Sequence, residues 1–135
     1  MLLPGAAQAM EIRQFDKMAI QDQGNYIQAL VDGAQKVLND EGQRDLAIKV
    51  DQLFSETHHG DTMPLGMIEF ENNLALARVA DAKRVIKDPS ARRLEIEDAM
   101  IVTMRKNGIE LPPSFLTVAG NFKPKYPPQS EDKKN

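Results

Sequence analysis

The stretch DQGNYIQALVDGAQKVLNDEG, residues 22–42, decides the fold. Its large apolar side chains recur every three or four positions from Tyr26 to Leu38, with polar residues between them. This spacing places the apolar side chains on one face of an α-helix, and that face must be buried against other elements. We expect Asp22 to cap the helix at its N-terminus and Gly42 to end it.

Helical periodicity extends through most of the remaining chain, whereas the alternation typical of β-strands never continues for long. Further helices are expected over five ranges, at about 12–22, 43–56, 64–87, 90–107 and 113–119. The helix at 64–87 is apolar on more than one face, so we expect it to be the central buried helix. Asp88-Pro89 is expected to begin the helix that follows. The predicted fold class is all-α, a single compact domain of five or six helices with a disordered C-terminal tail.

Length and composition agree with one domain and exclude several classes of partner. The chain has 135 residues, of which 41% are hydrophobic, and this is enough to bury a core. The formal net charge is −3 with acids and bases interspersed, so neither nucleic acid nor an anionic membrane is an expected partner. The sequence contains no cysteine, which removes disulfides, thiol catalysis and thiolate metal sites. No apolar run approaches the roughly 20 residues of a membrane span, and the oligomeric state is not predicted.

The two ends of the chain differ in composition from its middle. Residues 1–9 resemble the end of a secretory signal peptide, with Ala7-Gln8-Ala9 as a small-residue cleavage site and Met10 as the first mature residue. Few apolar residues precede this site, so the alternative is an irregular N-terminus that mimics the pattern. Residues 10–122 form the predicted helical domain, and the proline- and lysine-rich residues 123–135 the predicted disordered tail. The expected localisation is periplasmic or secreted.

One interior loop carries side chains that bind metals. His58 and His59 are flanked by Glu56 and Asp61, and imidazole with carboxylate suits zinc or nickel. Adjacent histidines in an extended loop point in opposite directions, however, and no distant histidine completes a three-ligand site. We therefore interpret the cluster as a solvated loop.

Paired carboxylates are the next candidates for chemistry. Glu69 and Glu71 form one pair, and Glu95 and Glu97 form another. Side chains two positions apart on a helix point to different sides, so neither pair converges on a substrate. We expect these residues to be surface charges.

The remaining polar and sulfur-containing candidates have structural interpretations. The serines lack the glycine-flanked turn of a nucleophile and lie at expected helix ends: Ser55, Ser90 and Ser114. Asn72-Asn73 is expected on a solvated strip of its helix, with a buried polar network as the alternative. The methionines Met67, Met100 and Met104 are expected to fill the core, with an apolar ligand cavity as the alternative. The sequence predicts no catalytic, cofactor-binding or metal-binding residue, and no cofactor.

Two segments resemble a known family. They are YIQALVDGA at residues 26–34 and DPSARRLEIEDAM at 88–100, the latter ahead of Leu111-Pro112. The layout is similar to that of the small periplasmic α-helical immunity proteins that neutralise amidase effectors of type VI secretion. The chain lacks the cysteines that this family commonly pairs. The resemblance implies a toxin-binding role and transfers no site residue.

These observations favour a non-catalytic function. The leading hypothesis is an exported helical binding module for a protein partner or a small apolar ligand, with an immunity-type inhibitor as one form of it. The alternative is a small periplasmic enzyme, a hydrolase that uses Glu or His in a cleft. A contiguous exposed apolar groove favours the binding module, whereas a deep pocket with convergent Glu or His favours the enzyme.

Overall fold

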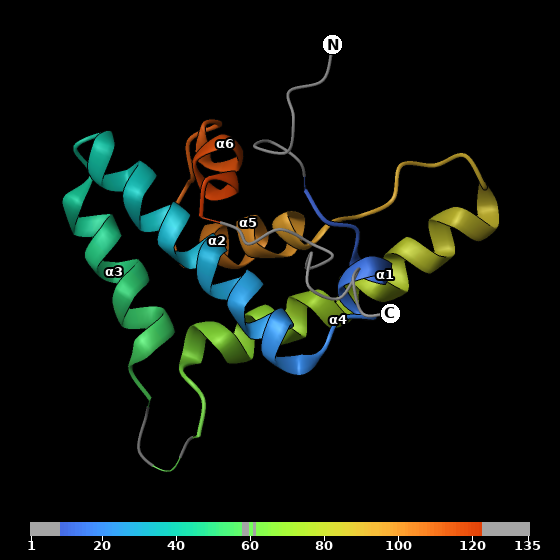
Figure 1. Ribbon diagram of the computed structural model, residues 1–135, viewed down its shortest axis with the longest axis horizontal. Helices are drawn as coiled ribbons and strands as arrows, with labels where there is room; N and C mark the ends of the chain where they lie inside the picture. Colours follow the sequence, from blue (N-terminus) through green and yellow to red (C-terminus); the bar gives the residue numbers. More distant parts are fainter. Residues whose placement is uncertain (1–8, 58–59, 61, 123–135) are drawn as a thin grey trace, which may run out of the picture.

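The computed structural model describes residues 9–57, 60 and 62–122. In these residues the chain forms six helices, namely α1 (Ile12–Phe15), α2 (Ile20–Asp40), α3 (Arg44–Ser55), α4 (Leu65–Lys87), α5 (Ile96–Lys106) and α6 (Phe115–Gly120) (Figure 1). The predicted all-α fold class is confirmed. The predicted tail and nearly all of the predicted signal remnant lie outside the described residues.

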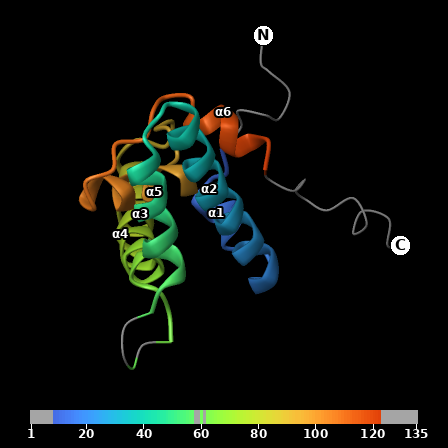
Figure 2. The ribbon, with the colours of Figure 1, turned by 90° about the vertical axis from the view of Figure 1, so that its left-hand side faces the viewer.

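The central helix is α2, and not α4 as the sequence suggested. It packs against both α3 and α6 (Figure 2). Its buried residues occupy most of its length: Tyr26, Ile27, Ala29, Leu30, Val31, Gly33, Ala34, Val37 and Leu38. At Gly33, a Cβ atom would lie 2.6 Å from the Cα atom of Ala119, so the missing side chain allows α6 to approach closely.

The ends of α2 show which parts of the predicted helix were correct. Gly42 has φ of 78°, and the Gln43 N–H donates a hydrogen bond of 2.8 Å to the carbonyl of Leu38, so the helix ends as expected. The start differs, because Ala19 is the N-cap residue and Asp22 lies within the first turn. The expected helix at 12–22 is correspondingly short, since α1 ends at Phe15.

A second layer contains α4 and α5, which pack against each other, and α3 also contacts α4. The first half of α4 buries Phe70 and Leu74, and α5 buries Met100 and Met104 in the same core. Gly66, at the start of α4, allows α3 and α4 to pack closely. A Cβ atom at this position would lie 2.6 Å from the backbone oxygen of Leu53 on α3. The second half of α4 extends away from α2 and α3, and residues 88–95 return from its end to α5 (Figure 1).

The fifth helix begins six residues later than expected. Asp88 does not cap a helix; its Oδ1 atom accepts hydrogen bonds from the backbone and the hydroxyl of Ser90 in a local turn. Glu95 is the N-cap residue instead, in a capping box with Asp98.

Within the described ranges, none of the helices combines the length and apolar character that crossing a membrane requires.

Candidate protein-binding surface

One face of α4 exposes large apolar side chains. Leu76 is 65% exposed, Val79 54% and Ile86 82%. The spacings of three and seven residues place them in one row along the helix. The opposite side of α4 buries Phe70, Leu74 and Asp81, so the exposed row faces away from the core. We call this row the α4 apolar face.

The exposed residues around the α4 apolar face include small and basic ones. Ala75, Ala80 and Ala82 are exposed beside it, and their short side chains leave the helix backbone accessible to a close neighbour. Lys83 is exposed between Val79 and Ile86, and Lys87 is exposed directly after Ile86. The C-terminal half of the surface is therefore both apolar and positively charged.

Buried hydrogen bonds orient α4 on α5. The Asn73 amide donates to the Thr103 hydroxyl over 2.8 Å, and this hydroxyl donates to the carbonyl of Ala99 over 2.8 Å. Lys106 Nζ donates to Asn73 Oδ1 over 3.1 Å. The buried-network alternative is thus correct for Asn73, whereas Asn72 is exposed as first expected. These bonds fix the rotation of α4 and hence the direction of its apolar face.

Two ion pairs hold the projecting half of α4. Arg93 donates to Asp81 Oδ2 from Nε over 3.0 Å and from Nη2 over 2.6 Å, and the Leu94 N–H donates to Oδ1 over 2.8 Å. The hydrogen bond from Arg93 is the main cause that lowers the pKa of Asp81. Arg78 binds both carboxylate oxygens of Asp16, over 2.9 and 2.8 Å. Both acids are therefore occupied by contacts within the fold.

A second buried polar group joins α2 to α5. Tyr26 donates a hydrogen bond to Glu97 Oε2, and the backbone N–H of Met10 donates to Oε1 over 3.1 Å. Both side chains are 2% exposed. Burial, followed by the negative charge of Glu97, raises the pKa of Tyr26 far above its usual value. The phenol therefore stays protonated and acts as a hydrogen-bond donor.

The other predicted carboxylates occupy different places. The expectation of surface charge is wrong for Glu97, which is buried because Tyr26 and Met10 supply donors from distant parts of the chain. Burial raises the pKa of its neighbour Glu95, which caps α5. Glu69 accepts a hydrogen bond of 2.7 Å from Asn107. These carboxylates do not meet in a common cleft.

The remaining candidates are the methionines and the histidine loop. Met100 and Met104 are fully buried in the core as predicted, and Met67 packs against it. His58, His59 and Asp61 are not among the described residues, so the solvated-loop interpretation stays a prediction. No group of three His, Asp or Glu side chains able to hold a metal occurs in the part of the chain that is described.

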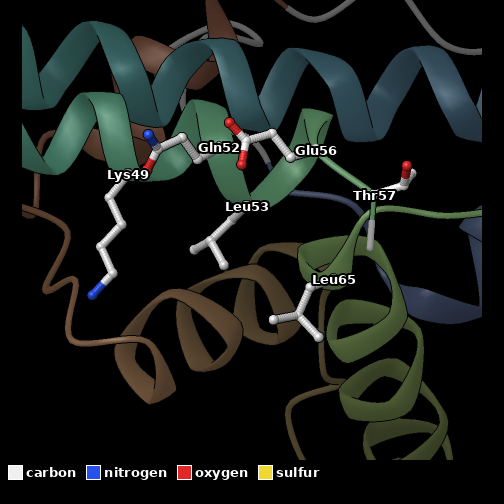
Figure 3. A pocket seen from close by; sticks show the side chains of 6 residues that line it. All are labelled: Lys49, Gln52, Leu53, Glu56, Thr57 and Leu65. Atoms are coloured by element: carbon white, nitrogen blue, oxygen red, sulfur yellow. The ribbon is translucent and has the colours of Figure 1, made fainter. Parts of the chain in front are cut away.

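A small hollow of about 220 Å³ lies between α3 and the start of α4 (Figure 3). Its lining residues are Lys49, Gln52, Leu53, Glu56, Thr57 and Leu65. Leu53 and Leu65 project into the space between the two helices, while Glu56 lies along α3 (Figure 3). None of Met67, Met100 and Met104 is among these lining residues, which include one carboxylate, Glu56, and one amine, Lys49. The hollow is therefore a weaker candidate site than the α4 apolar face.

Comparison with known proteins finds no matching family model, no matching curated protein and no matching solved structure.

Proposed function

We propose that this protein is a non-catalytic, exported binding module that binds a protein partner through the α4 apolar face. The observation that carries the proposal is the outward row of Leu76, Val79 and Ile86 on a helix whose other side is anchored in the fold. Exposed apolar side chains cost free energy in water, and burying them against a partner recovers it. A small apolar ligand is not favoured, because the row is convex and does not enclose a cavity.

The geometry favours one kind of partner. A straight row at helical spacing matches an amphipathic helix, whose apolar side chains pack between those of α4 as in a coiled coil. The exposed alanines permit close contact of the two backbones. Lys83 and Lys87 favour acidic residues on the partner beside its apolar stripe. The occupant we propose is therefore an acidic amphipathic helix of another protein.

Such a partner is compatible with an immunity-type inhibitor, whose target would be a secreted toxin, and the resemblance noted in the sequence implies the same role. The hydrolase alternative receives no specific support from the described residues. It requires Glu or His in a cleft, but Glu97 is buried against Tyr26 and Glu69 is bound by Asn107.

The test compares two variants in which exposed apolar side chains are replaced with serine. The first replaces Leu76, Val79 and Ile86 with serine. The matched control replaces Ile20 and Ile48, which are 85% and 49% exposed on α2 and α3, with serine. Both variants remove exposed apolar side chains from helices, so both should keep the circular dichroism of the wild type.

Calorimetry measures the affinity of each variant for the partner protein. This partner is first isolated through its binding to the wild-type protein and is then purified. Burial of a Val, Leu or Ile side chain contributes about 1.5–3 kcal/mol, so the α4 variant should bind at least about 30-fold more weakly. The control variant should bind within about twofold of the wild type. Equal weakening by both variants, or none by the α4 variant, contradicts the proposal. So does self-association of the purified chain that the α4 serines abolish, because the occupant is then a second copy.

A further inference from the structure

The backbone nitrogen of Met10 lies against a buried carboxylate. It donates a hydrogen bond of 3.1 Å to Glu97 Oε1, while the Tyr26 hydroxyl donates to Oε2. Glu97 is 2% exposed. A carboxylate at this depth interacts more strongly with a positive charge than with a neutral amide, because little water is present to screen it.

Backbone pairing fixes the position of this nitrogen. The Ile96 N–H donates a hydrogen bond of 2.9 Å to the carbonyl of Met10, and the Ile12 N–H donates one of 3.1 Å to the carbonyl of Leu94. These bonds hold Met10 antiparallel to the residues that begin α5, directly beside Glu97. A positive charge on the Met10 nitrogen therefore lies beside the Glu97 carboxylate, and no further loss of chain entropy is needed to place it there.

The sequence places a candidate cleavage site at the same atom. Ala7 and Ala9 form the small-x-small pattern that signal peptidases recognise, and the bond to be cut joins Ala9 to Met10. Hydrolysis adds water across this bond. The hydroxyl group goes to the Ala9 carbonyl carbon, and a hydrogen goes to the Met10 nitrogen. The new Ala9 carboxylic acid releases a proton, and the new amine of Met10 takes one up at neutral pH.

We propose that cleavage after Ala9 converts the Met10 nitrogen into an ammonium group that forms a buried ion pair with Glu97, and that the domain reaches full stability only after this cleavage. Before cleavage the same nitrogen is a neutral amide, which donates a hydrogen bond to the carboxylate but brings no opposite charge to it. Cleavage also requires access to the Ala9–Met10 bond, so it precedes the docking of this segment beside α5. Cleavage therefore comes first, and the domain completes its fold afterwards.

The size of the effect is a balance of two contributions. The amide already makes a charge-assisted hydrogen bond, so cleavage adds the attraction between opposite charges and subtracts the cost of desolvating the ammonium, and we expect the net gain to be about a tenfold change in the folding equilibrium constant. The residual cost of burying the carboxylate is present in both forms and cancels in the comparison.

The test compares the urea unfolding of four forms of the chain: residues 10–135 with a free Met10 amine, the same form acetylated at Met10, residues 9–135, and residues 1–135. Acetylation is the matched control, because it leaves an N–H at the same position and removes only the charge. The free-amine form should have a folding equilibrium constant about tenfold above those of the other three. Equal constants in all four forms would overturn the proposal.

A second comparison tests whether the stabilisation by the Met10 amine depends on Glu97. In Glu97→Gln the difference between the free and acetylated forms should fall below about twofold. If that variant does not fold, the rate at which an acylating reagent modifies the Met10 amine decides instead. The amine of the native wild type should react at least about tenfold more slowly than that of the urea-unfolded chain, and equal rates would refute the ion pair. This proposal rests on the export part of the proposed function, through cleavage after Ala9, and not on the α4 apolar face, so the ion pair and the binding surface can fail independently.

Discussion

Replacing Tyr26 with phenylalanine removes a single hydroxyl group from the contact between α2 and α5. The ring is buried and packs edge to face on Phe15, with centroids 6.1 Å apart, and phenylalanine preserves this packing. The hydroxyl donates to the buried carboxylate of Glu97, and a hydrogen bond to a charged acceptor contributes about 1.5–3 kcal/mol. We therefore expect Tyr26→Phe to lower the free energy of unfolding by that amount, and the melting temperature by roughly 6–12 °C.

Urea titration followed by circular dichroism measures the loss. A double-mutant cycle with Glu97→Gln isolates the interaction, and we expect a coupling energy of at least about 1 kcal/mol because the two groups are in direct contact. A loss below about 0.5 kcal/mol in Tyr26→Phe, with no coupling to Glu97, would show that the buried polar contact does not stabilise the junction. The stated reason for the burial of Glu97 would then be wrong.

Two further predictions concern the core and the projecting half of α4. Leu74→Ala should cost about 2–5 kcal/mol through lost burial and a residual cavity, whereas Arg44→Ala at the exposed start of α3 should cost less than about 0.5 kcal/mol; urea titration of both decides whether Leu74 is a core residue. The pKa of Asp81 is lowered in the folded state from its usual value of 3.8, so the unfolded chain binds more protons and stability falls as the pH drops from about 4 to 2. Asp81→Asn should flatten this part of the stability profile, and an unchanged slope would show that the contact with Arg93 is not what perturbs the carboxylate.

The sequence predicted α2 and α3 well, because local features of the sequence determine their extent. The period from Tyr26 to Leu38 predicted α2 because one face of that helix is buried along most of its length. Gly42 marked its end, since a residue with positive φ is required there. The boundaries of α3 were predicted to within a residue at each end for the same reason.

Long-range contacts explain the predictions that failed. The fifth helix was expected from residue 90, but the side chain of Asp81 binds Arg93 and Leu94 and holds that segment in an extended loop. Glu97 was expected at the surface because its spacing of two from Glu95 points the two carboxylates to different sides of a helix. Its donor Tyr26 lies 71 positions away, and no local pattern identifies such a partner.

The candidate site was also partly visible in the sequence. The abundance of apolar residues and alanines on more than one face of α4 was correctly recognised, but it was interpreted as burial. Leu76 and Ile86 are exposed because the neighbouring helices cover only the other side of α4. Composition indicates how much apolar surface a helix has, whereas the arrangement of the other helices decides how much of it is covered.

The central claim, that the α4 apolar face binds a protein, is tested most directly by site-specific photo-crosslinking in cells that export the protein. A photoreactive amino acid replaces Val79, and in a control it replaces Ile48 on α3. We expect a crosslink to one defined polypeptide from position 79, none to that polypeptide from position 48, and loss of the first crosslink when Leu76 and Ile86 are changed to serine. Equal crosslinking from both positions, or a crosslink that survives the serine substitutions, would contradict it.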